Sequence, residues 1–171
     1  MESSIDKIDR ILAQWRRERP DLDVTQMGVI GRLGRLRNIL MMELDRVFRQ
    51  HDLNGASFDV LATLRRSGPP YALSPSQLIE WTMVTSGTMT NRLDKLEEAG
   101  LITRQRNPED GRGFVVALTP LGFELIDAAV TDHVANQHRL LEGLSSDEMT
   151  QLDGLLRKWL AAVSDKGVSE Q

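Results

Sequence analysis

The sequence contains no cysteine. This absence excludes disulfide bonds, thiolate zinc sites and cysteine-based redox sensing, because all three need a cysteine sulfur. Positive charge is also in short supply: 21 lysines and arginines face 25 aspartates and glutamates, for a formal net charge of −4. Binding to nucleic acid would therefore need a local basic patch, since the overall field does not attract phosphate.

Long apolar runs are missing as well. No stretch approaches the roughly 18 apolar residues of a membrane-spanning helix, and the opening MESSIDKIDRILAQW is too charged for a signal peptide. We therefore expect a soluble, cytoplasmic protein. A length of 171 residues fits one globular unit with a sizeable core.

Patterns typical of enzymes are absent. His51, His133 and His138 offer no metal-ligand spacing on a common face, and the chain has no P-loop, HExxH motif or nucleophile elbow. The glycines of GVIGRLG, residues 28–34, recur every third position without a preceding strand, which favours close helix packing over a nucleotide-binding loop. We expect no catalysis, no cofactor and no metal site.

Apolar residues recur every three or four positions along most of the chain, which predicts a mainly helical protein. Ser57 is expected to cap one helix, and Ser145 with Glu148 forms a capping box for another. Helices are predicted over about residues 5–19, 29–51, 58–66, 75–81, 85–99, 120–141 and 146–163.

The segment LITRQRNPEDGRGFVVALT alternates around a turn-rich centre, which predicts a β-hairpin. The order helix, short helix, amphipathic helix, hairpin is that of a winged helix-turn-helix, so the expected fold is mainly α with a small β wing. Residues 55–119 would form this lobe, and residues 1–54 and 120–171 would form flanking dimerisation helices. The apolar stripes of those helices exceed what one chain can cover, which favours a homodimer with two-fold symmetry.

The amphipathic helix within VTSGTMTNRLDKLEEAGLI places Met89, Leu93 and Leu96 on one buried stripe. Its other face begins with short polar groups and carries a cation later, an order that suits a helix entering the major groove. The candidate DNA-binding residues on it are Ser86, Gly87, Thr88, Thr90, Asn91 and Lys95. In the alternative interpretation, the first hydroxyls only cap the helix and the remaining polar residues are a solvated face.

The predicted hairpin carries arginines on both sides of its turn: Arg104, Arg106 and Arg112. An arginine-bearing loop beside a recognition helix is suited to contacts with the minor groove or the DNA backbone. These residues therefore join the candidate DNA-binding set.

At this point the sequence resembles the MarR family of bacterial transcription regulators. The resemblance rests on DGRGFVVALTPLG, in which Asp110, Arg112, Leu118, Thr119 and Gly122 match that family's wing signature. It implies a dimer that binds a pseudo-palindromic DNA operator, with Asp110 orienting Arg112 toward the minor groove. Gly111 departs from the family pattern, where a basic residue is common, and this weakens the expected wing contact.

A narrower resemblance concerns the urate-responsive branch of the family, which includes PecS-like regulators. It rests on WRRERPDLD, FDVLATLRRSGPPY and TSGTMTNRLD. It implies a pocket, shared by the N-terminal helices and the DNA-binding lobe, for a small anionic aromatic effector such as urate that releases a repressor from DNA. The residues carried over to this pocket are Trp15, Asp59, Arg66 and Arg92.

The residues of this pocket have other interpretations. Trp15 could be an ordinary core residue, Asp59 could interact with the helix dipole, and Arg92 could form a permanent ion pair with Asp59. For the whole chain, the alternative is a winged-helix module for protein interaction without a ligand response. The sequence leaves the effector, the operator, and repression or activation open.

Overall fold

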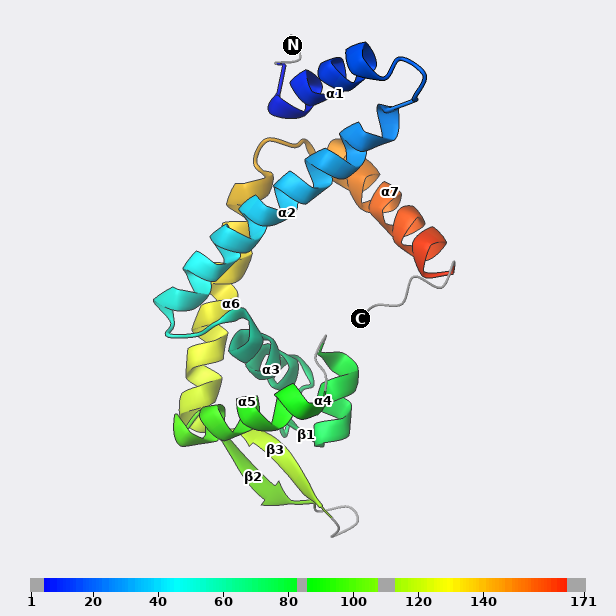
Figure 1. The fold of residues 1–171 in the computed structure, drawn as a ribbon. Coiled ribbons are helices and arrows are strands. Elements are labelled where there is room, and N and C mark those ends of the chain that lie inside the picture. Colours follow the sequence, from blue (N-terminus) through cyan, green and yellow to red (C-terminus); the bar gives the residue numbers. More distant parts are fainter. Residues whose placement is uncertain (1–4, 83–85, 108–112, 166–171) are drawn as a thin grey trace.

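The computed structural model describes residues 5–82, 86–107 and 113–165, which form seven helices and three short strands (Figure 1). The prediction of a mainly helical fold with a small β wing is confirmed. Two long helices, α2 (Thr25–Gln50) and α6 (Pro120–Leu141), pack against each other and connect an upper helical region with a lower lobe. None of the helices in these ranges has an apolar segment long enough to span a lipid bilayer.

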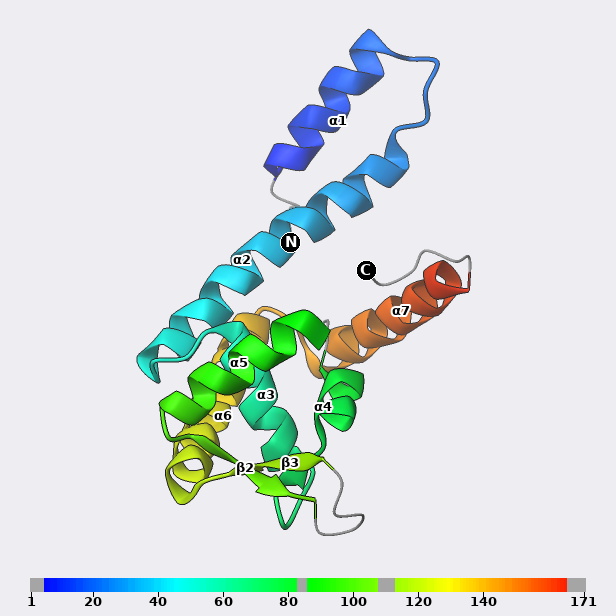
Figure 2. The same ribbon diagram turned by 60° about the horizontal axis from the view of Figure 1, so that its bottom comes forward.

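Helix α1 (Lys7–Glu18) packs against α2 in the upper region (Figures 1 and 2). Its first turn is closed by a capping box of Asp6 and Asp9, where an Asp6 carboxylate oxygen accepts the Asp9 N–H at 2.9 Å. The guanidinium of Arg32 on α2 donates to both carboxylates, at 2.9 Å to Asp6 and 2.5 Å to Asp9. These contacts fix the start of α1 against α2.

The glycines of α2 explain part of this close approach. A Cβ added to Gly28 would lie 3.2 Å from a methyl group of Leu12, and one added to Gly31 would lie 3.2 Å from a methyl group of Ile8. Gly34 has no such neighbour within 4 Å. The predicted close packing therefore holds at the first two glycines and not at the third.

The lower lobe contains α3 (Gly55–Arg66), α4 (Pro75–Trp81) and α5 (Ser86–Glu98). The prediction that Ser57 caps α3 is wrong. Asn54 occupies the N-cap instead, and its side-chain oxygen accepts the Ser57 N–H at 2.9 Å. Three apolar side chains of α3 (Val60, Leu61 and Leu64) are completely buried and form the centre of the lobe.

The wing is a three-stranded antiparallel sheet in the order β1-β3-β2. Strands β2 (Ile102–Arg106) and β3 (Phe114–Leu118) form the predicted hairpin, with Arg104 opposite Val116. Strand β1 (Ala72–Leu73) pairs with the other edge of β3 and was not predicted, because two residues carry no readable alternation.

The turn between α5 and the wing packs tightly on the start of α6. Gly100 ends α5 with a φ of +70°, a conformation that favours glycine. The Thr119 hydroxyl donates to the Gly100 carbonyl at 2.7 Å and accepts the Gly122 N–H at 3.0 Å. A Cβ on Gly122 would lie 1.9 Å from the Leu101 carbonyl oxygen, so only glycine fits there. The threonine and glycine of the Leu-Thr-x-x-Gly pattern therefore join α6 to the base of the wing.

Helix α7 (Ser146–Ser164) extends away from α6 and leads to the C-terminus (Figure 1). Its predicted capping box is present, since a Glu148 carboxylate oxygen accepts the Ser145 N–H at 2.8 Å. No residue of α7 is buried, and its large apolar side chains lie exposed or only partly covered. The described part of the chain therefore leaves the apolar face of this helix largely uncovered.

Candidate nucleic-acid interface

Helix α5 presents two different faces. Met89, Leu93 and Leu96 are buried in the core of the lobe, with 1–3% of their surface exposed, which confirms the predicted stripe. Thr90, Asn91 and Lys95 are exposed on the same helix. The described part of the surface thus carries a hydroxyl and an amide that can reach base edges and a cation that can meet phosphate.

For the first turn of α5 the structure describes the backbone but not the side chains. Ser86, Gly87 and Thr88 belong to the first turn of the helix, but their side chains lie outside the described residues. Their predicted contacts with DNA remain predictions.

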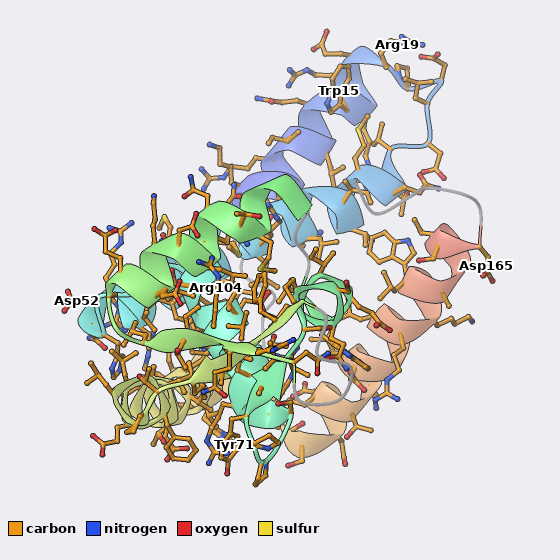
Figure 3. The ribbon with its side chains drawn as sticks, turned by 90° about the horizontal axis from the view of Figure 1, so that it is seen from below. Trp15, Arg19, Asp52, Tyr71, Arg104 and Asp165 are labelled. Atoms are coloured by element: carbon orange, nitrogen blue, oxygen red, sulfur yellow. The ribbon has the colours of Figure 1, made fainter. Side chains whose placement is uncertain are left out.

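The three wing arginines differ in how the structure places them. Arg106 is exposed at the end of β2. Asp110 and Arg112 lie outside the described residues, so their predicted roles in the wing stay predictions. Arg104 lies at the base of the wing, and its guanidinium reaches back to α5 (Figure 3).

The contacts of Arg104 are with carboxylates of α5. Its Nη1 donates to Glu97 and its Nη2 donates to Asp94, both at 2.6 Å. Glu97 also accepts the backbone N–H of Arg104 at 3.0 Å. The place of Arg104 near the hairpin turn suggested that it faces DNA. The signal that could have indicated the intramolecular pairing is Glu97, an acidic residue seven positions earlier in the sequence.

The four predicted ligand-binding residues are not all together in one chain. Trp15 is 42% exposed on α1, which lies at the opposite end of the molecule from α3, the helix of Asp59 and Arg66 (Figures 1 and 2). Arg92 lies half-buried on α5. The ion pairs found among the described residues do not include one between Arg92 and Asp59, and the permanent salt bridge considered above stays a prediction.

One member of that set lines a cavity. Arg66, at the end of α3, borders a space of about 370 Å³ together with Thr63, Ser67, Leu73 and Trp81. The Arg66 Nη2 donates to the backbone carbonyl of Trp81 at 2.9 Å, at the C-terminal end of α4. No sequence pattern indicated Trp81, because α4 is too short for its apolar pattern to show which side chain borders a cavity.

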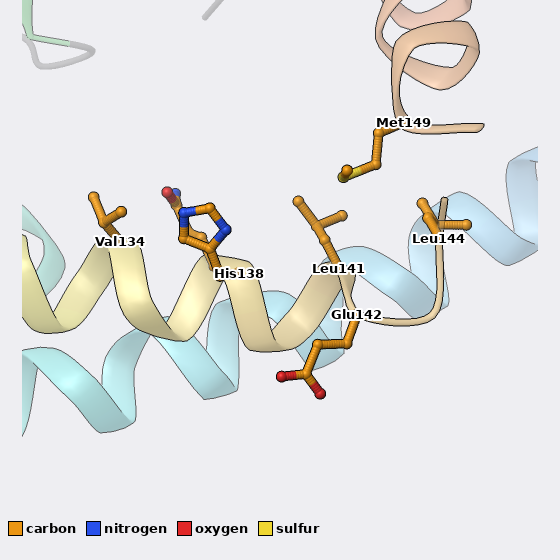
Figure 4. A pocket seen from close by; sticks show the side chains of 7 residues that line it. Val134, His138, Leu141, Glu142, Leu144 and Met149 are labelled. Atoms are coloured by element: carbon orange, nitrogen blue, oxygen red, sulfur yellow. The ribbon is translucent and has the colours of Figure 1, made fainter. Parts of the chain in front are cut away.

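A second cavity, of about 420 Å³, lies where α6 meets α7 (Figure 4). Its walls are mainly apolar, with Val134, Leu141, Leu144 and Met149 beside His138. Met149 on its wall is also one of the exposed apolar side chains of α7. Among the described residues no group of three potential ligands could hold a metal ion.

Comparison with known proteins places this geometry in context. The sequence model of the MarR family matches residues 51–113. The HTH-type transcriptional regulator PecS of Dickeya dadantii is 45% identical over 150 residues, which span 88% of this chain and 90% of PecS.

Two solved structures are also similar. A cysteine-to-serine mutant of Escherichia coli MarR complexed with operator DNA matches with a TM-score of 0.68 and 27% identity, covering 80% of this chain and 97% of that one. AbsC, a MarR family transcriptional regulator from Streptomyces coelicolor, matches with a TM-score of 0.72 and 22% identity, covering 84% and 97%, a likeness of fold. The proteins named here are transcriptional regulators, not enzymes, which agrees with the function class expected from the sequence.

Proposed function

This chain belongs to the MarR family of transcriptional regulators, and on that basis we propose that it binds a pseudo-palindromic DNA operator as a homodimer and represses transcription. Helix α5 would lie in the major groove, and the wing would reach the adjacent minor groove. The similarity to the MarR–operator complex supports this docking, since the shared fold spans almost all of that chain.

The observation that carries the proposal is the division of α5 into two faces. Three buried side chains fix the helix on the lobe, so its exposed polar face has a defined direction. Thr90 and Asn91 are short enough to let the helix backbone approach base edges. Lys95 lies one turn later, where phosphate contact positions such a helix.

The homodimer is supported by apolar surface that one chain leaves uncovered. Helices α1, α2 and α7 expose large hydrophobic side chains, whereas a monomer rarely exposes large contiguous apolar patches. The exposed residues on these helices, with Ile5 just before α1, are Ile5, Ile11, Trp15, Met27, Val29, Ile30, Leu33, Leu36, Ile39, Met41, Met42, Met149, Leu152, Leu155, Leu156 and Leu160. We assign residues 1–54 and 120–171 to the interface, and residues 55–119 to the DNA-binding lobe. Two-fold symmetry would then present two copies of α5 to successive major grooves.

The proposed effector is a small anionic aromatic molecule such as urate. Arg66 offers a guanidinium to the 370 Å³ cavity, and Trp81 offers an indole ring at its border. An anion that attracts Arg66 would compete with the Trp81 carbonyl, and that carbonyl lies at the end of α4, directly before the segment that leads to α5. Trp15 can join Asp59, Arg66 and Arg92 in one pocket only if the second subunit supplies it.

DNA binding is tested with the DNA upstream of the protein's own gene. We expect a complex that resists competitor DNA and whose affinity falls steeply with salt. Thr90→Val combined with Asn91→Ala should lower the affinity for operator and leave the affinity for random DNA unchanged, because base contacts carry specificity. Equal losses on both DNAs would contradict the assignment of α5 as the reading helix.

The effector is tested by calorimetry with urate and related purines. Arg66→Gln and Arg92→Gln should abolish the heat of binding, and Trp15→Ala should reduce it if the partner supplies the ring. Arg65→Gln is the matched control, since Arg65 lies beside Arg66 on α3 but pairs with Asp127. Equal heats for all these proteins would exclude the pocket.

A further inference from the structure

The base of the wing is tied to α5 by one side chain. Arg104 on β2 makes two charge-assisted hydrogen bonds, to Glu97 and to Asp94, each 2.6 Å long. The same Glu97 carboxylate accepts the Arg104 backbone N–H at 3.0 Å. Three hydrogen bonds thus join the last turns of α5 to the middle of an edge strand. We call Arg104, Glu97 and Asp94 the wing clamp.

The arginine of the wing clamp is largely shielded from solvent, whereas the side chains of Glu97 and Asp94 are 37% and 59% exposed. Only 26% of the Arg104 side chain is exposed, and its Nε is buried without an acceptor among the residues that the structure describes. The guanidinium carbon lies 5.5 Å from the centre of the Phe114 ring on the neighbouring strand β3. Arg104 therefore contacts both strands of the wing and α5 at once.

We infer that Arg104 is a positioning residue, which sets the angle of the wing relative to α5 and does not itself contact DNA. The inference rests on the proposed DNA-binding function. It gives Arg104 a different role from the DNA contact that its place near the turn suggested.

Electrostatics favour this role. One guanidinium and two carboxylates leave the wing clamp with a net charge of −1, so it does not attract phosphate. A phosphate that took over the Arg104 guanidinium from the carboxylates would leave two negative charges beside the DNA. Intramolecular pairing is therefore the favoured state of Arg104 in the presence of DNA as well.

Geometry explains why the angle matters. Beyond Arg104 the described part of the hairpin pairs through Gln105 and Arg106, and the Asn107 N–H donates to the Gly113 carbonyl at 3.3 Å, so the wing projects from the clamped position. A small rotation at Arg104 moves the tip of the wing by a larger distance. Wing and α5 must enter adjacent grooves together, so a wing held at one angle binds without first losing orientational freedom.

The first test compares variants on operator DNA at several salt concentrations. Arg104→Met retains an unbranched apolar stem and removes the charge, and Glu97→Gln retains an acceptor for the backbone N–H and removes the ion pair. Both should weaken operator binding about fivefold to tenfold, with the salt slope unchanged and the minor-groove part of the hydroxyl-radical footprint lost. Lys95→Met is the control, and it should reduce the salt slope by about one.

A DNA contact by Arg104 predicts the opposite. Glu97→Gln would then tighten binding, because it frees the arginine for phosphate, and Arg104→Met would reduce the salt slope by about one. Either result would overturn the inference. Uniform weakening of the whole footprint would also overturn it, because that is the result of a general loss of structure.

The second test needs no DNA. The absence of native cysteine allows spin labels at Glu98→Cys on α5 and Gln105→Cys on β2, both at exposed positions. The distance distribution between them should be narrow in this labelled protein and clearly broader after Arg104→Met. An unchanged distance distribution after Arg104→Met would overturn the inference even if the protein binds its operator. If the distribution broadens but no operator complex forms, only the proposed DNA-binding function is overturned.

Discussion

The DNA-binding lobe and helix α7 differ in what covers their apolar side chains. The apolar stripe of α5 is 97–99% buried by α3, α4 and the wing of the same chain. On α7, Leu155 and Leu160 expose 66% and 61% of their surface, and no residue is buried. Both helices have the same kind of amphipathic sequence, so periodicity alone does not reveal whether the covering surface comes from the same chain.

This difference divides the expected stability into two parts. Full burial of a leucine side chain contributes about 1.5–3 kcal/mol, and the lobe obtains this contribution within one chain. The described part of the chain leaves α7 without this contribution, so the proposed association would supply it. The contribution of α7 should therefore depend on protein concentration, whereas the contribution of the lobe core should not.

The largest expected effect is in the lobe core. Leu61→Ala removes a completely buried side chain of α3, so the free energy of unfolding should fall by about 2–5 kcal/mol. Leu61→Met, which conserves volume, should cost less than about 1.5 kcal/mol. Chemical denaturation at several protein concentrations measures both values. A loss for Leu61→Ala that grows on dilution would contradict a core closed within one chain.

Substitutions on α7 should affect the stability of the lobe less than Leu61→Ala does, but they should strongly weaken dimer assembly. Leu156→Glu combined with Leu160→Glu should raise the dimer dissociation constant at least about a hundredfold, because two charges would enter an apolar interface. Analytical ultracentrifugation measures this, and Lys158→Glu, about 200° around the helix from Leu156, is the control. An unchanged dimer in the double variant would place the interface elsewhere.

The pH dependence of stability should come partly from His133 on α6, the helix that runs from the wing toward α7. This ring on α6 packs near Phe48 and Phe58, at centroid distances of 5.5 and 4.9 Å, and burial lowers its pKa below the ordinary value of 6.5. The unfolded chain then binds the proton more readily, so stability is complete above about pH 6.5 and falls as the pH is lowered.

His133→Gln tests this contribution. The variant should lose less stability than the wild type between neutral and mildly acidic pH, measured by thermal denaturation at each pH. His138→Gln, which removes an exposed histidine from the same helix, is the matched control variant. Parallel profiles for His133→Gln and the wild type would contradict a protonation cost at this ring.

The smallest effect should come from the surface charges of α7. Arg157 pairs with Asp153 one turn earlier, but their side chains are 80% and 62% exposed. Arg157→Met should change the free energy of unfolding by less than about 1 kcal/mol, because exposed ion pairs contribute little. A larger loss that depends on protein concentration would show that this pair lies within the dimer interface.

Sequence periodicity predicted the parts of the fold that depend on local pattern. The buried stripe of α5, the glycine that ends it and the capping box of α7 follow from the residues within each segment. The cap of α3 was missed because Asn54 and Ser57 are both good capping residues, and only the path of the backbone decides between them. Strand β1 depends entirely on pairing with β3.

The site was less predictable, because it depends on contacts between segments. Resemblance indicated Arg66, whereas Trp81 borders the same cavity only through the packing of α4 on α3. The charge of Arg104 suggested DNA, but its partners become visible only when β2 folds back along α5. Position on a helical wheel gives the face of a side chain, not the group that already occupies it.

Hydroxyl-radical footprinting of an operator fragment, combined with native mass spectrometry of the same complex, tests the central claim most directly. Two chains should bind one duplex and protect two half-sites whose centres lie about 10–10.5 base pairs, one helical turn, apart, or at a multiple of that spacing. One chain per duplex, or protection of a single half-site, would contradict a dimer that presents two copies of α5.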